Sequence, residues 1–374
     1  MERMAKLGHE IHVIDHDFLW INKPREGVFV KERVFRNIPK VISGSECILV
    51  HRPSLIKLPL IDYFTIPIFH TKTILEEIIN FKPDILIGFG IVNCLIGQKI
   101  ASLYKIPFYY YLIDHLHTLL PIKKMRRLAK AIETNIIRNS TGVFVINKGL
   151  LDYADHLSGM KINGAIISGG VDIKRYQNVM KRDSIRTKYG IKDSDTVIFF
   201  MGWIYDFSGL KEVAEYIVEN ESQLTGLKLL IVGKGDLFDY INSLREKLSD
   251  KSKIILTGQV SFHAIPELLS ASDICILPAE NNEIMRNIVP IKLYEYLAAG
   301  KPVICTKLPG VIKEFGKNSG LVYINKPSDV FQVLQLIKSD YGKLRKKALD
   351  FVQYYDWDVI VQQFTDTLTE MNSN

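Results

Sequence analysis

The sequence predicts an α/β protein made of two doubly wound domains, each with a mainly parallel sheet. The chain has 374 residues, which is more than one typical hydrophobic core accommodates. Apolar strand-like runs alternate with helical patterns in the first half, and after a polar stretch the alternation starts again at residue 196. We therefore place the domains at residues 1–172, completed by a returning helix at 355–374, and at residues 173–354.

The first half contains predicted strands and helices in alternation. Strands are expected at residues 11–15, 28–35, 47–51, 83–88, 106–113 and 142–146, and helices at 3–8, 72–81, 94–104, 123–138 and 149–157. A domain of this kind normally opens with a strand and a glycine-rich loop before the first helix, and neither is expected here; either the start is truncated or another segment takes the place of that strand. Residues 55–69 are very apolar but interrupted by prolines and charges, so we interpret them as buried core plus loop; the alternative is an apolar surface at a membrane interface.

The second half repeats the pattern. Strands are expected at residues 196–201, 227–232, 254–257 and 274–277, and helices at 209–220, 237–248 and 265–271. Gly202 and Gly233 follow the first two strands and allow tight turns. Residues 173–194 are polar and charged, as is typical of a connection between domains.

Residues 287–304 form the most informative stretch. Pro290 fits the first turn of a helix, Gly300 ends that helix, and a buried strand follows. Lys292 and the amides of Ile291, Lys292 and Leu293 then suit an anion such as a diphosphate. Glu295, one turn on, can accept hydrogen bonds from sugar hydroxyls. The alternative is an ordinary amphipathic helix with Glu295 in solvent.

Positive charge is concentrated in the first half. Residues 1–171 hold 22 Lys and Arg against 15 Asp and Glu, whereas residues 172–374 hold 26 of each. This half is therefore expected to face something anionic, either a membrane surface or nucleic acid. Nucleic acid is disfavoured because no helix-turn-helix or aromatic signature accompanies the charge.

The helix expected at residues 123–138 is basic and could be part of the surface that faces the anionic partner. Its apolar residues recur at steps of three and four, which leaves a charged face. That face is either simply solvated or lies on an anionic membrane surface.

Cysteine usage favours a reducing compartment. Cys47, Cys94, Cys275 and Cys305 are far apart and form no CxxC pair, so we expect reduced core thiols, no disulfides and no zinc site. The opening residues lack the pattern of a signal peptide. We expect a cytoplasmic protein, peripheral on the inner face of the membrane if the basic half binds lipid.

Asp114, His115 and His117 follow the predicted strand at 106–113. Parallel α/β sheets bind ligands at the carboxyl ends of their strands, so these polar side chains are candidate catalytic residues. A purely structural role is the alternative.

The second half resembles the retaining GT-B glycosyltransferases of the glycogen-synthase-like family. The resemblance is carried by the sequence KLYEYLAAGKPVI at residues 292–304, and by the segments 165–172, 230–235, 255–260 and 271–278, which occur in the family's order. Residues 354–357 are similar to the entry of the family's last helix. The resemblance implies two Rossmann-like domains facing a central cleft, and transfer of a sugar from a nucleoside-diphosphate sugar without a required metal or other cofactor.

The resemblance also implies roles for individual residues. Glu295 matches the acid that holds the donor ribose, and Lys292 stands where a basic residue holds the diphosphate. Gly258 and Gln259 match the turn near the nucleobase. Arg286 would share the phosphate charge with Lys292.

Two departures concern the chemistry. Asn287 stands where the family has the first acid of its Glu-x₇-Glu motif, and an amide cannot act as a base. Trp203 and Ser208 replace basic residues around the Gly202 turn. Asn287 is nevertheless a catalytic candidate together with Asp114, His115 and His117, because a donor phosphate oxygen can take the acceptor's proton.

The resemblance therefore implies a hexosyltransferase acting with retention, and with the basic first half it leads us to expect a role in surface polysaccharide or glycolipid assembly, on a carbohydrate or lipid-linked acceptor. Two alternatives stay open. One is a GT-B protein that binds a nucleotide sugar without transferring it, and the other is a nucleotide-sugar epimerase of similar fold.

Overall fold

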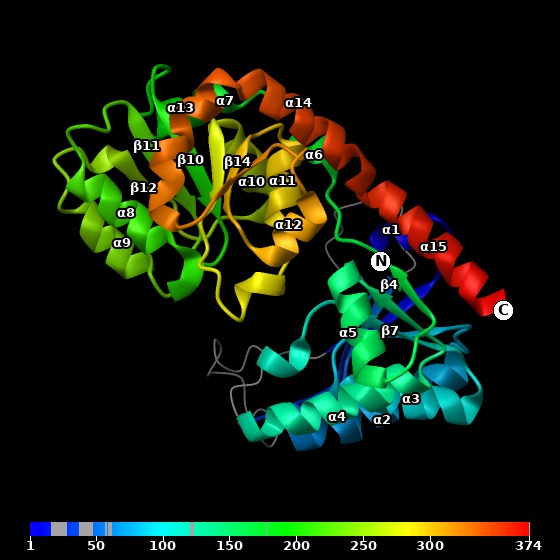
Figure 1. Cartoon of the computed structure of the whole chain (residues 1–374). Helices are drawn as coiled ribbons and strands as arrows, with labels where there is room; N and C mark the ends of the chain where they lie inside the picture. Colours follow the sequence, from blue (N-terminus) through cyan, green and yellow to red (C-terminus); the bar gives the residue numbers. More distant parts are fainter. Residues whose placement is uncertain are drawn as a thin grey trace. The chain divides into compact units, whose positions relative to one another are not determined.

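The computed structural model describes residues 1–15, 28–36, 48–56, 58, 62–119, 123–177 and 179–373, and all statements below refer to these. The chain divides into two compact units (Figure 1). Unit 1 comprises Met1–Ser168 with Ile360–Asn374, and unit 2 comprises Gly169–Val359. Each unit is built around a parallel sheet with helices packed on it, as expected for α/β domains.

Unit 2 contains a six-stranded parallel sheet in the order β12-β11-β10-β13-β14-β15. Its strands are β10 (Thr196–Met201), β11 (Leu227–Val232), β12 (Ile254–Leu256), β13 (Ile274–Leu277), β14 (Val303–Thr306) and β15 (Leu321–Ile324). The predicted strand at 196–201 is confirmed at both ends. The order reverses between β10 and β13, and ligands of doubly wound sheets bind at the carboxyl ends of the strands beside such a reversal.

Alternate residues of each strand enter two separate cores, one on each face of the sheet. In β10, Val197, Phe199 and Met201 join one core, while Ile198 and Phe200 join the other. The first core includes α7 (Arg182–Lys188), α10 (Ile265–Ser270), α11 (Lys292–Ala298), α12 (Pro309–Phe315) and α14 (Tyr341–Val352). The second includes α8 (Leu210–Glu219), α9 (Phe238–Arg245) and α13 (Leu334–Ser339) (Figure 1).

Short helical turns complete unit 2. They are α6 (Ile173–Tyr176), η2 (Asp206–Ser208), η3 (Lys251–Lys253), η4 (Phe262–Ala264), η5 (Met285–Asn287), η6 (Pro327–Val333) and η7 (Gln353–Tyr355). Cys275 and Cys305 are buried free thiols in this unit, and Cys94 is one in unit 1, as predicted; Cys47 lies outside the described residues.

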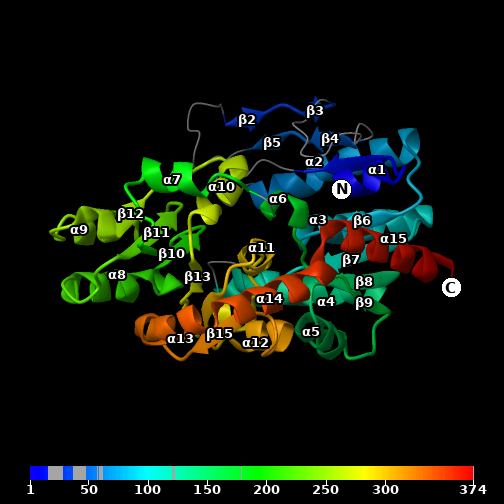
Figure 2. The ribbon, with the colours of Figure 1, turned by 90° about the horizontal axis from the view of Figure 1, so that it is seen from above.

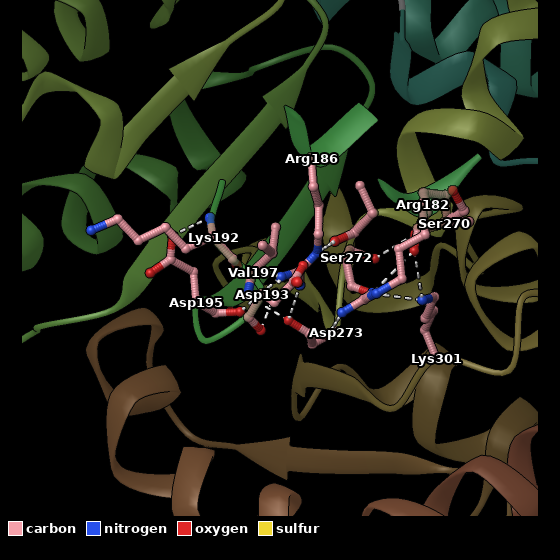
Figure 3. Close-up of polar contacts among 12 residues, drawn as sticks. Arg182, Arg186, Lys192, Asp193, Asp195, Val197, Ser270, Ser272, Asp273 and Lys301 are labelled. Atoms are coloured by element: carbon pink, nitrogen blue, oxygen red, sulfur yellow. Dashed lines mark hydrogen bonds and ion pairs between the residues drawn. The ribbon is translucent and has the colours of Figure 1, made fainter. Parts of the chain in front are cut away.

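The polar stretch at 173–194 is not the simple connection that the sequence predicted. It contains α6 and α7, and Arg186 of α7 is almost fully buried beside Asp273 (Figure 3). The two side chains form an ion pair at 2.8 Å, and Arg182 adds a second one to Asp273 at 2.7 Å. Arg186 also donates to the carbonyls of Ala271 and Lys192. The charges of this stretch thus fix α7 to unit 2, because each buried charge has a partner.

Unit 1 contains a second parallel sheet, of four strands in the order β6-β7-β8-β9 (Figure 2). Its elements are β6 (Leu86–Gly88), α3 (Val92–Tyr104), β7 (Phe108–Leu112), η1 (Leu116–Leu119), α4 (Lys123–Asn139), β8 (Gly142–Val145), α5 (Lys148–Ser158) and β9 (Gly164–Ile166). The last helix, α15 (Trp357–Ser373), joins this unit from Ile360 onward. Its Phe364 packs edge-on against Phe144 of β8, with the ring centroids 4.7 Å apart.

The N-terminal part of unit 1 forms a smaller sheet in the order β1-β4-β3, with β1 and β4 parallel. Its elements are α1 (Glu2–Lys6), β1 (Ile11–Ile14), β3 (Arg33–Phe35) and β4 (Ile48–Arg52), while β2 (Phe29–Val30) pairs separately with β5 (Leu55–Ile56).

Helix α2 (Asp62–Asn80) begins ten residues before the predicted helix at 72–81, so the prediction of a loop up to residue 69 is wrong there. Pro67 misled the prediction: it lies inside the helix, and Thr71 donates a hydrogen bond to its carbonyl oxygen at 2.7 Å. None of the helices in the described residues is both long and apolar enough to span a membrane.

Candidate functional site

Three glycine turns lie next to one another at the carboxyl edge of the unit 2 sheet. Gly202, Gly233 and Gly258 follow the adjacent strands β10, β11 and β12, with φ angles of 121°, 144° and 69°. The amide of Gly233 donates to the carbonyl of Gly258 at 3.0 Å. A Cβ on Gly233 would lie 2.0 Å from the carbonyl oxygen of Gly202. Glycine is therefore required here by both the backbone angle and the close approach.

Lys292, at the start of α11, extends to the first of these turns. Its ammonium nitrogen lies 2.7 Å from where a Cβ on Gly202 would stand, and 4.4 Å from the centre of the Phe200 ring. In the part of the chain that the structure describes, no oxygen accepts a hydrogen bond from this nitrogen. Burial lowers the pKa of Lys292 to about 8, although the charge of Glu295 acts in the opposite direction. Among the described residues, no carboxylate forms an ion pair or hydrogen bond with this half-buried cation.

Helix α11 is held against the end of β10 by Tyr296, whose hydroxyl oxygen accepts a hydrogen bond from the Met201 amide at 2.9 Å.

The three amides predicted to bind an anion at the start of α11 are only partly free. The Leu293 amide already donates to the carbonyl of Pro290 at 3.0 Å, and the Leu293 side chain lies in the core. The amides of Ile291 and Lys292 have no acceptor among the described residues, and the Ile291 side chain is exposed.

Glu295 is half-buried on the same helix, one turn after Lys292. The hydroxyl of Tyr176 donates to its Oε1 at 2.5 Å. Burial raises the pKa of Glu295, while the Tyr176 hydrogen bond and the charges of Arg175 and Lys292 act to lower it. Tyr176 lies in α6, far from Glu295 in sequence, and no sequence signal pointed to it.

The remaining donor-side candidates lie in loops. Gln259 is exposed directly after the Gly258 turn, and Arg286 is exposed in η5. Asn287 ends η5, and its side chain is outside the described parts of the structure. Asn282 positions η5, because its side-chain oxygen accepts from the amide of Met285 at 2.8 Å.

A second cation, Lys234, was not among the sequence candidates. It is exposed within the turn after β11, and its Cε lies 3.7 Å from where a Cβ on Gly258 would stand. No described residue provides its ammonium with an acceptor. Trp203 is exposed and Ser208 is buried, so Lys234 and Lys292 provide the positive charge directly at the glycine turns. Its position between Gly233 and Gly235 was the sequence signal that could have identified it.

In unit 1, Asp114, His115 and His117 follow β7, as predicted. Oδ1 of Asp114 accepts a hydrogen bond from the His115 amide at 2.7 Å. The His115 ring stacks on Tyr153 with the centroids 4.3 Å apart. Nδ1 of His117 lies 3.3 Å from the Tyr153 hydroxyl and 3.3 Å from Oε2 of Glu133.

Glu133 is the centre of this cluster. Its side chain is fully buried, Tyr153 donates to Oε2 at 2.7 Å, and Tyr110 donates to Oε1 at 3.2 Å. Burial raises the pKa of Glu133, while its hydrogen bonds with Tyr153 and Tyr110 act to lower it. Burial lowers the pKa values of His115 and His117. Glu133 was not among the residues predicted from the sequence, although it is the only acid in the basic helix α4 and its side chain is buried.

The structure thus brings the predicted residues together in two groups. Gly202, Gly233, Gly258 and Lys292 are in direct proximity in unit 2, and Glu295 joins them through α11. Asp114, His115 and His117 form a cluster with Glu133 in unit 1. The first group offers a cation and glycine turns without side chains to an anion, and the second offers neutral imidazoles to a hydroxyl group.

Comparison with known proteins gives this arrangement a family context. Residues 181–350, which lie within unit 2, match the family model described as Glycosyl transferases group 1. TuaC of Bacillus subtilis, provisionally named as a teichuronic acid biosynthesis glycosyltransferase, is 28% identical over 187 residues, which cover 50% of this chain and 43% of TuaC. The chain spans less than half the length of the curated relatives it matches.

Solved structures share the fold over most of the chain. The HepE protein of Anabaena in complex with UDP has a TM-score of 0.67 at 16% identity, with 87% of each chain covered. Sucrose-phosphate synthase of Thermosynechococcus elongatus has a TM-score of 0.73 at 13% identity, covering 100% of this chain and 91% of the other. The fold is therefore GT-B, with two Rossmann-like domains, and the predicted fold class is confirmed.

Proposed function

We propose that this chain, whose residues 181–350 match the family model described as Glycosyl transferases group 1, transfers a hexose from a nucleoside-diphosphate sugar to an acceptor hydroxyl with retention of configuration. The observation that carries the proposal is the ammonium of Lys292. It stands at the Gly202 turn and is half-buried, and no carboxylate among the described residues forms an ion pair with it. Leaving a buried cation unpaired costs stability, so an anionic ligand that occupies this position would offset that cost.

A diphosphate suits this position. Its oxygens would accept charge-assisted hydrogen bonds from Lys292, and the glycine turns let phosphate oxygens approach the backbone closely. Lys234 beside Gly258 would add a second positive charge. The departing nucleoside diphosphate gains negative charge during transfer, and fixed cations stabilise that charge in the transition state.

Glu295 would hold the donor ribose. Tyr176 occupies one of its carboxylate oxygens at 2.5 Å and fixes its orientation, while Oε2 keeps free acceptor capacity for a sugar hydroxyl. Gly258 and Gln259 would lie beside the nucleobase. In this proposal Arg286 adds charge at the edge of the site.

The acceptor would bind in unit 1, near Asp114, His115 and His117. Because burial lowers the pKa of both histidines, their imidazoles are neutral at pH 7 and can exchange hydrogen bonds with a hydroxyl group. Glu133 and Tyr153 keep His117 in place. Neutral polar groups of this kind suit a carbohydrate or a lipid-linked sugar.

The proposed chemistry needs no base at position 287. The acceptor oxygen bonds to the anomeric carbon as the bond from that carbon to the phosphate oxygen breaks, and the hydroxyl proton passes to the leaving phosphate. Asn287 would then only hydrogen-bond the sugar. We expect no metal to be required for this step.

The relatives support the substrate class. HepE was solved with UDP and TuaC is named for teichuronic acid biosynthesis, which favours a UDP-sugar donor and a role in surface polysaccharide or glycolipid assembly. Attachment to an anionic inner membrane surface would follow from α4, whose Lys124, Arg127, Lys130 and Arg138 are exposed beside Leu128. The protein would then be peripheral and cytoplasmic.

Two measurements test the proposal. In a thermal-shift screen against UDP, GDP and their hexose derivatives, a nucleotide at 100 times its Kd should stabilise the protein by about 2.7 kcal/mol. Release of free sugar, or its transfer to an acceptor, is then followed by chromatography. Binding without any release or transfer would favour a nucleotide-sugar-binding protein, whereas conversion of the free donor into its epimer would favour an epimerase.

The membrane part is tested separately, by sedimentation with vesicles of phosphatidylglycerol at low salt. We expect co-sedimentation that is lost when Lys124, Arg127 and Lys130 are changed to Gln, since each basic residue contributes about 1 kcal/mol near an anionic surface. Wild-type protein that stays in the supernatant would rule this attachment out.

A further inference from the structure

Two histidines and one glutamate that could bind a metal ion lie close together at the N-terminal sheet of unit 1. None of them belongs to the candidate site described above. His12 of β1, His51 of β4 and Glu77 of α2 each direct one ligand atom toward the others. Nδ1 of His12 contacts Oε2 of Glu77, and Nε2 of His51 lies 3.1 Å from Oε1 of the same carboxylate. The three ligand atoms all lie within 4.8 Å of one another.

Hydrogen bonding does not account for the whole group. Nε2 of His51 is buried and has no hydrogen-bond partner of acceptable geometry, despite its closeness to Glu77. A buried polar atom without a partner costs free energy, and in native structures such atoms often mark an ion or a water. A cation between the three side chains would satisfy this nitrogen.

The surroundings restrain the two histidines. The His12 ring stacks on Phe81 at a centroid distance of 3.7 Å, with an interplanar angle of 10°. The other ring nitrogen of His12 lies 3.7 Å from Oε1 of the exposed Glu10, which adds a negative charge beside the imidazole. His51 is fixed by the parallel pairing of β4 with β1, which aligns His12 with Leu49 and His51 with Ile14.

The donor set indicates the kind of metal. Two imidazoles and one carboxylate suit Zn²⁺ and related first-row divalent ions, whereas Mg²⁺ and Ca²⁺ prefer oxygen ligands. Zinc binds nitrogen and carboxylate oxygen at about 2.0–2.2 Å, so neighbouring ligand atoms around it are roughly 3.3 Å apart. The 3.1 Å separation of His51 Nε2 and Glu77 Oε1 is close to this spacing.

We propose that His12, His51 and Glu77 bind one zinc ion, with water as the fourth ligand, and that this ion joins β1, β4 and α2. The two strands and the helix come from separate parts of the chain, so one ion would connect three elements of unit 1. The site departs from the expectation, drawn from cysteine spacing, that the chain has no zinc site. It is structural, and the expectation that sugar transfer needs no metal is unchanged.

The test begins with the full chain stripped of metal by a chelator. Zinc is titrated in competition with a chromophoric chelator, and metal content is measured after dialysis. We expect one zinc per chain, and with saturating zinc a rise of several degrees in the unfolding temperature. Cobalt should bind in the same place and give the visible absorption of a tetrahedral site, which zinc then abolishes.

Two variants on one helix provide the comparison. Glu77→Gln removes the carboxylate ligand, and zinc affinity should fall at least tenfold. Glu76→Gln is the matched control, because Glu76 is a more exposed neighbour that pairs with Lys72 at 3.6 Å. It should bind zinc like the wild-type protein.

The proposal is overturned if the wild-type chain binds no zinc at one equivalent, or if Glu77→Gln and Glu76→Gln bind it equally well. Should Glu77→Gln fail to fold, the cobalt spectrum of the wild-type protein still decides: a purely octahedral spectrum, typical of cobalt in water, would exclude the site. None of these readouts depends on sugar transfer, so failure of the proposed function would leave them unaffected.

Discussion

The ammonium nitrogen of Lys292 lies 2.7 Å from the point where a Cβ on residue 202 would stand, so the absence of a side chain on Gly202 makes room for the charge. This relationship links a glycine turn after β10 to the first residue of α11, which are 90 positions apart in the chain. The turn and the cation therefore form one unit of structure. Changing either residue should affect anion binding.

Lys292→Met should make the protein more stable and remove its affinity for nucleoside diphosphates. Burial holds the pKa of Lys292 near 8, below its usual value of 10.5, so the charged form is less favourable in the folded than in the unfolded protein. Replacing it with an apolar side chain of similar length should stabilise the fold at pH 7 by about 1–2 kcal/mol. Chemical denaturation and UDP titration measure the two effects.

The sign of this effect can be checked with pH. Between about pH 8 and 10.5 the unfolded chain binds more protons at this position than the folded protein does. The gain in stability of Lys292→Met over the wild type is therefore full below pH 8 and disappears as the pH rises to 10.5. Lys317→Met, at an exposed lysine of the same unit, should change neither stability nor UDP affinity. A Lys292→Met variant that binds UDP as well as the wild type would refute the site.

Donor binding should weaken above pH 8. The free protein loses the Lys292 proton near that pH, and the Kd for UDP is expected to rise by up to about tenfold per pH unit above it. Calorimetric titration from pH 7 to 9.5 measures this. Lys292→Arg, which keeps its charge, should delay the loss if the longer side chain fits. A Kd that stays constant over this range would mean that Lys292 does not contact the phosphates.

The sequence predicted this part of the molecule well because its signals are local. The strands of unit 2 are continuous apolar runs bounded by glycine, and β10 has the predicted bounds. Lys292 and Glu295 lie on one short helix, so their proximity follows from helical spacing. Where a proline lies inside a helix, as Pro67 does in α2, the local signal is misleading.

Contacts between distant segments could not be predicted in this way. Tyr176 meets Glu295 because α6 packs against α11, and Glu133 meets His117 because α4 packs beside the end of β7. The proposed zinc ligands His12, His51 and Glu77 are likewise brought together only by the fold. Single-sequence patterns contain no information on such pairs, since each residue alone is an ordinary polar side chain.

Gly233→Ala should damage the donor side far more than a comparable change elsewhere. Gly233 has a φ of 144°, and an added Cβ would lie 2.0 Å from the carbonyl oxygen of Gly202, so the two turns would have to separate. We expect a loss of more than 2 kcal/mol in stability and a loss of UDP binding.

Gly190→Ala is the matched control. Gly190 also has a positive φ, of 64°, but nothing lies within 4 Å of the added Cβ. It should lose only about 1 kcal/mol from backbone strain and bind UDP normally. Equal losses in the two variants would show that strain alone, and not the contact between the turns, is responsible.

Tyr176→Phe tests whether Glu295 is held for a ligand. The Tyr176 hydroxyl donates to Oε1 of Glu295 at 2.5 Å, and burial otherwise raises the pKa of this carboxyl. Removing the hydroxyl should raise that pKa further and loosen the Glu295 side chain. UDP binding should then weaken by roughly threefold to tenfold, the equivalent of about 0.5–1.5 kcal/mol.

Glu295→Gln should lower donor turnover by about tenfold or more, since a charged hydrogen-bond acceptor is lost.

The pH profile separates positioning from a merely structural role. Glu295 must be ionised to accept two hydroxyl groups, so in Tyr176→Phe the acidic limb of UDP binding should move to higher pH than in the wild type. A structural defect would weaken binding equally at all pH values. Binding of 2′-deoxy-UDP completes the experiment. If Glu295 holds the ribose, Glu295→Gln should weaken the binding of 2′-deoxy-UDP less than the binding of UDP. The same loss of affinity for both nucleotides would place the ribose hydroxyl elsewhere.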